Sequence, residues 1–281
     1  MLVKKKTKKM SDRMKKMVNF ILIVLILFCT VLLIYSGYHI FLWNKDNNSI
    51  NEQVSEIEEL TEVKAVDDTP KTEIVNPVKD KTNIYWDFIK VSLIDVDFSE
   101  LKKKNNDVVG WIQVSGTNVN YPFVQTNDNK YYLTHQFDKK YNQAGWVFMD
   151  YRNNKDEFDK NTILYGHGRI DKTMFGSLRN VIKSSWYSNS NNHIVKMSTE
   201  YENTLWQVFS TYKIKTTNDY LAIDFSSDED YLNFLNMLKE RSSYDYKVSL
   251  TAEDKIITLS TCNNDTEKIV LHAKLIKREK K

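Results

Sequence analysis

The chain has 281 residues and a formal net charge of +3, because 40 basic side chains face 37 acidic ones. This near balance gives no indication of a polyanionic partner, and we predict no nucleic-acid binding. Only seven glycines are present. None of them forms a glycine-rich phosphate loop, which excludes a nucleotide-binding site of that kind.

A basic tail and an apolar run occupy the N-terminus. Residues 20–38 are almost entirely apolar, about the length that spans a bilayer. The run is longer than the core of a cleaved signal peptide, and no A-x-A site follows it. The basic residues before it are Lys4, Lys5, Lys6, Lys8, Lys9, Arg13, Lys15 and Lys16. Positive charge on that side predicts a cytoplasmic tail over 1–17 and a single-pass transmembrane signal-anchor helix over 18–43, with the rest of the chain outside.

Residues 44–81 are polar, are acidic in their first half, and contain Pro70 and Pro77. Such a composition is typical of a spacer that buries no core of its own. We predict an extracytoplasmic stalk here, with one short helix at 52–61 followed by an extended linker. The remaining residues, 82–281, are numerous enough for a single domain with a sizeable core.

The pattern of that domain changes after two predicted short helices, at 85–91 and 98–104. Short runs of β-branched and aromatic residues follow, separated by Asn, Asp and Gly. The candidate strands are 111–114, 121–124, 146–149, 162–165, 193–197, 204–215, 255–261 and 268–277. Many short strands at this spacing predict a mainly β barrel or sandwich.

One clear helix interrupts the strands. Ser227, with Asp230 three residues later, matches an N-terminal capping pattern. The apolar residues that follow recur at helical spacing and are Tyr231, Phe234, Leu235 and Leu238. We predict that this helix packs on the sheet, and its part in lining a substrate groove stays open because an apolar stripe is more often core. Residues 173–181 are a second candidate helix.

Cys262 stands at the end of the predicted strand 255–261, directly before a turn of sequence NND. The other cysteine, Cys29, lies inside the apolar run at the N-terminus, so the two do not share a compartment. An unpaired cysteine in an exported domain is either a reactive thiol or a small buried hydrophobic residue.

A second feature is the apolar strand NTILYGHG at 161–168, in which His167 stands between two glycines. The glycines predict a sharp turn that leaves the imidazole accessible. An imidazole near a thiol favours the thiolate that attacks a carbonyl. Cys262 and His167 are therefore a candidate catalytic pair. No set of His, Cys and carboxylate residues has metal-ligand spacing, and we predict neither a metal nor a cofactor.

These motifs resemble a known family. The sequence TLSTC at 258–262, followed by a strand that ends in AKL at 273–275, and YGH at 165–167 are similar to the sortases, membrane-anchored cysteine transpeptidases of Gram-positive bacteria. The segments at 106–112, 121–125 and 145–150 resemble those of class B. The resemblance covers the chain from Tyr85 onward. It implies an eight-stranded β-barrel with flanking N-terminal helices and a helix between strands six and seven.

The resemblance also implies a set of site residues. Cys262 would be the nucleophile and His167 the acid and base, while Ser260, Thr261 and Tyr165 would lie at the substrate. The family's arginine on the last strand falls on Lys268, and lysine offers one compact cation in place of a fork of donors. Two alternatives stay open: a register shift in the loop 263–267, or Arg241 or Arg169 supplied from elsewhere. For His272, on the same strand, a structural role is favoured.

The implied reaction cleaves a C-terminal sorting signal of a secreted surface protein after Thr, with an NPQTN-like signal favoured. A thioacyl-enzyme then passes the protein to an amine of a peptidoglycan precursor. One alternative is a pilus-polymerising sortase that uses a pilin lysine. Another is a weakly active sortase-like domain that binds without turnover, for which Lys268 is the support.

Overall fold

The computed structural model describes residues 11–261 and 266–281. The chain divides into two compact units, Met1–Ser49 and Ile50–Lys281. The helix α1 (Asp12–Leu60) starts in the first unit and ends in the second. Within the described part of the chain, α1 is the one helix long and apolar enough to cross a membrane, and its apolar stretch is not buried.

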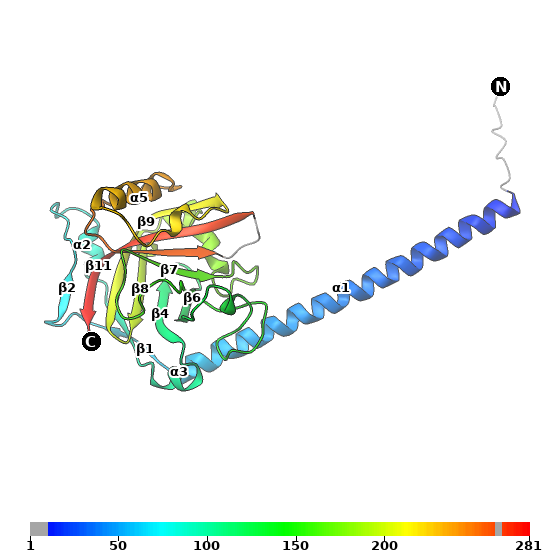
Figure 1. Ribbon diagram of the computed structural model, residues 1–281, viewed down its shortest axis with the longest axis horizontal. Coiled ribbons are helices and arrows are strands. Elements are labelled where there is room, and N and C mark those ends of the chain that lie inside the picture. Colours follow the sequence, from blue (N-terminus) through cyan, green and yellow to red (C-terminus); the bar gives the residue numbers. More distant parts are fainter. Residues whose placement is uncertain (1–10, 262–265) are drawn as a thin grey trace, which may run out of the picture. The chain divides into compact units, whose positions relative to one another are not determined.

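Eight strands of the second unit form a closed barrel (Figure 1). They are β4 (Val108–Val114), β5 (Asn120–Val124), β6 (Phe148–Met149), β7 (Asn161–Gly166), β8 (Ile194–Thr199), β9 (Glu202–Lys215), β10 (Ile256–Thr261) and β11 (Glu267–Lys280). Their order is β10-β7-β6-β5-β4-β8-β9-β11, and the pairing of β11 with β10 closes the ring. Each of the eight strands predicted from the sequence overlaps one of these, so the predicted barrel is confirmed.

The closure depends on two long strands. β9 and β11 have 14 residues each and pair antiparallel along their length. Two register shifts interrupt the ladder, at His272/Ala273 and Leu275/Lys277. Such irregularities bend a strand and increase its twist, which lets a sheet close on itself. Large side chains fill the interior, and the fully buried ones include Trp111, Trp146, Trp206, Phe123 and Phe209.

Short helices and strands surround the barrel. The helices are α2 (Tyr85–Ile89), α3 (Ser99–Lys104), α4 (Ser184–Tyr187), α5 (Asp228–Glu240) and the 3₁₀ turns η1 (Tyr131–Leu133), η2 (Gly176–Asn180), η3 (Ser190–Asn192) and η4 (Asp219–Leu221). The predicted helix between the sixth and seventh strands is α5. Its N-cap is Ser227, whose hydroxyl accepts the Asp230 N–H at 3.1 Å, and its apolar face is buried.

The region 44–81, for which we predicted a stalk, contributes to the compact unit from residue 50 onward. Ile50 and Ile57 of α1 are buried in the barrel's hydrophobic cluster. β1 (Val63–Val66) pairs with β3 (Leu93–Val96), and β2 (Thr72–Ile74) extends the main sheet by pairing with β11. β1 and β2 are thus short strands that pair with strands formed elsewhere in the chain. This pairing orders a polar stretch that has no core of its own.

The neighbouring strands β7 and β10 run parallel. Their register ends with Ser260 opposite Tyr165 and Thr261 opposite Gly166. His167 is the next residue after β7. Because the C-terminal ends of parallel strands lie at the same edge of a sheet, this register brings the YGH and TLST segments to one end of the barrel.

Candidate active site

The ring of His167 is oriented by a backbone carbonyl. Its Nε2 lies 2.8 Å from the carbonyl oxygen of Leu133, in η1. A carbonyl oxygen only accepts hydrogen bonds, so Nε2 carries the proton in the neutral ring. Nδ1 is then the nitrogen that carries no proton in this tautomer.

Two glycines near this ring are required by close packing. A Cβ on Gly145 would lie 3.0 Å from Cδ2 of His167 and 2.4 Å from the Tyr132 carbonyl oxygen, and its φ of +61° is in the left-handed region. A Cβ on Gly166 would lie 2.8 Å from the Phe175 ring. Gly166 does not have a positive φ, so it is required by this close approach and not, as the sequence suggested, by a sharp turn.

An arginine holds the residues that follow His167. Arg179 donates from Nη2 to the carbonyl oxygens of Gly168 at 3.0 Å and Arg169 at 2.9 Å, and from Nε to that of Gly176 at 2.8 Å. The Phe175 N–H donates to the His167 carbonyl at 3.0 Å. The backbone of His167 and of the residues that follow it is therefore fixed.

The three residues predicted at the substrate have structural partners. The Ser260 hydroxyl lies 2.9 Å from the Tyr220 hydroxyl, and Thr261 Oγ1 accepts the Ile269 N–H at 2.9 Å, which ties β10 to β11. Both side chains are buried. Tyr165 donates its hydroxyl to Asp150 Oδ2 at 2.9 Å. All three residues stand at the end of the barrel where β10 ends.

Lys268 lies near the start of β11, opposite Ile214 of β9, and its side chain is half-buried. The two alternative arginines are both paired with carboxylates. Arg169 contacts Asp171 at 2.8 Å, and Arg241 contacts Asp219 at 2.5 Å. Cys262 follows Thr261 in the chain and lies outside the described residues.

His272 is fully buried between hydroxyl groups. Thr258 gives its hydroxyl hydrogen to Asn161 Oδ1 at 2.6 Å, so His272 Nδ1–H donates to Thr258 at 2.9 Å and Nε2 accepts from Tyr212 at 2.9 Å. Burial lowers the pKa of His272 to about 3, which keeps the ring neutral. The structure thus favours the structural role predicted for this residue. Over residues 11–261 and 266–281, no group of three or more His, Cys, Asp or Glu could hold a metal ion.

Comparison with known proteins identifies the family. The family model of the sortase domain matches residues 112–276, more than half of the 281 residues. The chain belongs to the sortase family.

The relatives specify the class. The Sortase B of Staphylococcus aureus is 41% identical over 184 residues, which cover 64% of this chain and 75% of the relative. Two sortase B structures match over 64% of this chain at 41% identity. One is the substrate complex of the S. aureus protein (TM-score 0.60, 84% of that chain), and the other is a sortase B complex with triglycine (TM-score 0.61, 85% of that chain).

A Bacillus anthracis protein described as similar to sortase B has a TM-score of 0.64 at 34% identity. That match covers 84% of this chain and 98% of the Bacillus chain. This sortase is therefore of class B, a cysteine transpeptidase of the kind that anchors proteins to the cell wall.

The sequence did not reveal the residues that orient the sortase histidine. Leu133 acts through its carbonyl oxygen, which any residue could supply, so no sequence signal marks it. Gly145 lay in a segment used for the class B resemblance, and an isolated glycine beside apolar residues was the available signal of a close approach. Arg179 donates to three carbonyl oxygens in a local turn. The sequence predicted a helix at 173–181, and that prediction gave no indication of these contacts.

Proposed function

We propose that this sortase is anchored in the membrane by α1, cleaves a C-terminal sorting signal after Thr, and transfers the secreted protein to an amine of a peptidoglycan precursor. The parallel register of β7 and β10 is the observation that supports this most directly. Cys262 is covalently next to Thr261, and His167 is next to Gly166, which pairs with Thr261. Because paired strands lie only about 4.8 Å apart, we expect the residues that follow this pair in the two segments to act on one substrate.

In the first step the Cys262 thiolate attacks the carbonyl carbon of Thr in the signal. The C–N bond breaks, the departing amine takes a proton from His167, and a thioester remains. In the second step His167 accepts a proton from the incoming amine, which attacks the thioester and releases the thiolate. Since the Leu133 carbonyl retains the Nε2 proton, both transfers pass through Nδ1.

The oxyanion of each tetrahedral intermediate requires a donor. Lys268 is the second residue of β11 and lies six positions after Cys262 in the sequence. Its ammonium would supply a positive charge that stabilises the oxyanion together with backbone N–H groups. Ser260 and Thr261 at the end of β10, and Tyr165 beside them on β7, would contribute to peptide binding through their position at this end of the barrel.

The relatives support the choice of substrates. One of the two sortase B structures holds a substrate and the other holds triglycine. We therefore propose an NPQTN-like signal as first substrate and a glycine-type amine of a peptidoglycan precursor as second. The predicted layout accompanies this, with a cytoplasmic tail at 1–17, a membrane-spanning helix within 18–43 and the catalytic domain at 82–281. Of the predicted stalk at 44–81, residues from 50 onward belong to the same compact unit as the barrel.

Formation of the thioacyl-enzyme tests the proposal. The full-length chain in detergent micelles is incubated with NPQTN-containing and scrambled peptides, and the intact mass is measured. Wild type and Cys29→Ala are expected to gain the mass of the acyl fragment from the NPQTN peptide only, and to lose it when triglycine is added. Equal labelling of Cys262→Ala would contradict the proposal.

A second candidate function, a domain that binds sorting signals with little turnover, is favoured by lysine at position 268. We expect Lys268→Met to lower the rate of thioacyl formation about 100-fold, the usual effect of removing one oxyanion donor, while Lys268→Arg remains active. Quench-flow kinetics with detection by mass spectrometry measure the rate of thioacyl formation for both variants. Inert wild type together with an active Lys268→Arg variant would support the binding domain instead. A ladder of covalent protein polymers as product would indicate the pilus-polymerising alternative.

A further inference from the structure

An ion pair between a buried carboxylate and a half-buried arginine lies beside β7. Asp150 is fully buried and accepts two hydrogen bonds from the Arg152 guanidinium, Nε to Oδ1 at 2.9 Å and Nη2 to Oδ2 at 2.8 Å. It also accepts the Arg152 backbone N–H at 3.0 Å and the Tyr165 hydroxyl at 2.9 Å. Burial raises the pKa of Asp150, but these donors outweigh it and the pKa lies below its ordinary value. The carboxylate is therefore ionised and its orientation is fixed.

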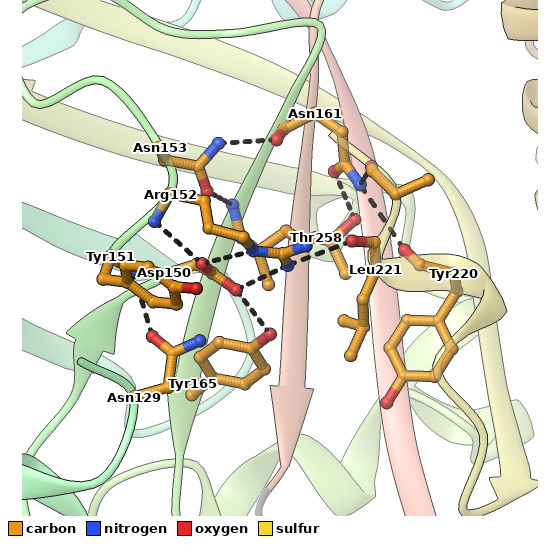
Figure 2. A network of polar contacts seen from close by, with 12 residues as sticks. Asn129, Asp150, Tyr151, Arg152, Asn153, Asn161, Tyr165, Tyr220, Leu221 and Thr258 are labelled. Atoms are coloured by element: carbon orange, nitrogen blue, oxygen red, sulfur yellow. Dashed lines mark hydrogen bonds and ion pairs between the residues drawn. The ribbon is translucent and has the colours of Figure 1, made fainter. Parts of the chain in front are cut away.

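Arg152 also reaches a second segment. Its Nη2 donates to the Leu221 carbonyl oxygen at 3.1 Å, so one guanidinium joins Asp150 to η4 (Figure 2). Asn161, at the start of β7, donates from Nδ2 to the Ala222 carbonyl at 2.8 Å and more weakly to that of Tyr220 at 3.4 Å. Arg152 and Asn161 thus both hold the backbone of residues 220–222, which lie outside the strands.

The segment held in this way lies against the catalytic strand. Tyr220 places its hydroxyl 2.9 Å from Ser260 Oγ, and Ser260 pairs in register with Tyr165. Tyr165 on one side and Tyr220–Leu221 on the other therefore flank the end of β10, as Figure 2 shows. Arg152 contacts one flank directly and the other through Asp150.

We propose that Arg152, oriented by Asp150, is a positioning residue that sets the spacing between Tyr165 and the segment 219–222, and thereby the fit of the peptide substrate at the end of β10. The inference rests on the proposed function, because it takes the substrate to lie where Cys262 follows β10. Arg152 has no part in the acyl transfer itself.

The chemistry of the pair explains why arginine is required. A guanidinium can donate two parallel bonds to a carboxylate and still direct a hydrogen to a carbonyl, whereas lysine is a single compact donor. Arg152→Lys retains the positive charge beside Asp150. A single ammonium, however, cannot donate two parallel hydrogen bonds to Asp150 and also reach the Leu221 carbonyl oxygen. The flanks then move apart while the reacting groups stay in place.

The test measures thioacyl formation against peptide concentration in full-length protein in detergent micelles. For Arg152→Lys we expect the half-saturating concentration of the NPQTN peptide to rise about tenfold, the effect of losing a charge-assisted hydrogen bond, with the maximal rate within about twofold of wild type. A larger residue before Thr in the peptide should raise the half-saturating concentration less for the variant than for wild type. An unchanged half-saturating concentration, or an equal fall in the maximal rate, would overturn the inference.

Two controls separate positioning from stability. Arg278→Lys changes an arginine that also pairs with a carboxylate, Glu73 at 2.8 Å, near the far end of β11, and should leave the peptide response unchanged. Arg152→Lys combined with Tyr165→Phe should raise the half-saturating concentration by less than the product of the single effects, because both act through Asp150. A multiplicative result, or a lowered Tm with unaltered kinetics, would reduce the pair to a structural role. Wild type that forms no adduct with any peptide would refute the proposed function and remove the basis of this inference.

Discussion

Replacing His167 by alanine is expected to lower the rate of thioacyl formation about 1000-fold. The imidazole donates a proton to the departing amine and later accepts one from the incoming amine, and each such transfer accounts for about 100- to 10,000-fold. Single-turnover kinetics at saturating peptide measure the rate without interference from product release. The loss should be in the rate, with the half-saturating concentration nearly unchanged.

His193 is a matched control for this variant. Its Nε2 also lies close to a backbone carbonyl, that of Tyr187 at 2.9 Å, and its ring is packed against Tyr246. His193→Ala should lower stability and leave the rate at saturation intact. A rate for His167→Ala within tenfold of wild type would show that another group moves the proton.

Replacing Lys274 by methionine is expected to destabilise the fold by about 3–5 kcal/mol, which corresponds to a fall in Tm of about 10 °C. The Lys274 ammonium lies 3.0 Å from Asp254, and both side chains are almost completely buried. Methionine fills a similar volume but leaves the Asp254 carboxylate without its cation in a region of low dielectric. Thermal unfolding of the full-length chain measures the effect.

Asp254 also accepts the Thr251 N–H at 2.7 Å and the Asn76 amide at 2.9 Å. Adding Asp254→Asn to Lys274→Met should restore part of the stability, because the buried charge disappears while an acceptor remains. Lys90→Met removes an exposed pair, Lys90 with Asp87, and should cost less than about 1 kcal/mol. A loss below that value for Lys274→Met would show that water reaches Asp254.

The barrel strands and α5 could be predicted because their signals are local. Alternating or continuous apolar runs marked all eight strands, and Ser227 with Asp230 marked the start of α5. The end of α1 was harder to place, because its polar residues after Ser49 have helical propensity and no Gly or Pro interrupts them before Pro70. β1 and β2 are ordered by partners far along the chain, which no local pattern reports.

The candidate site divides in the same way. His167 and Cys262 stand in distinctive short motifs, whereas their surroundings depend on contacts between distant segments. Arg152 reaches Leu221 across 69 positions, and His167 meets Leu133 across 34. Both contacts end on carbonyl oxygens, which carry no side-chain identity and so leave no trace in the sequence.

The order of strands in the barrel also has a consequence for the newly made protein. β10 lies between β7 and β11 in the barrel, and both β10 and β11 follow the other six barrel strands in the chain. Without β10 and β11, β7 and β9 each have an unpaired edge and the barrel wall has a gap. A chain that has not yet added these two strands therefore cannot close the barrel, however well the other six strands have paired.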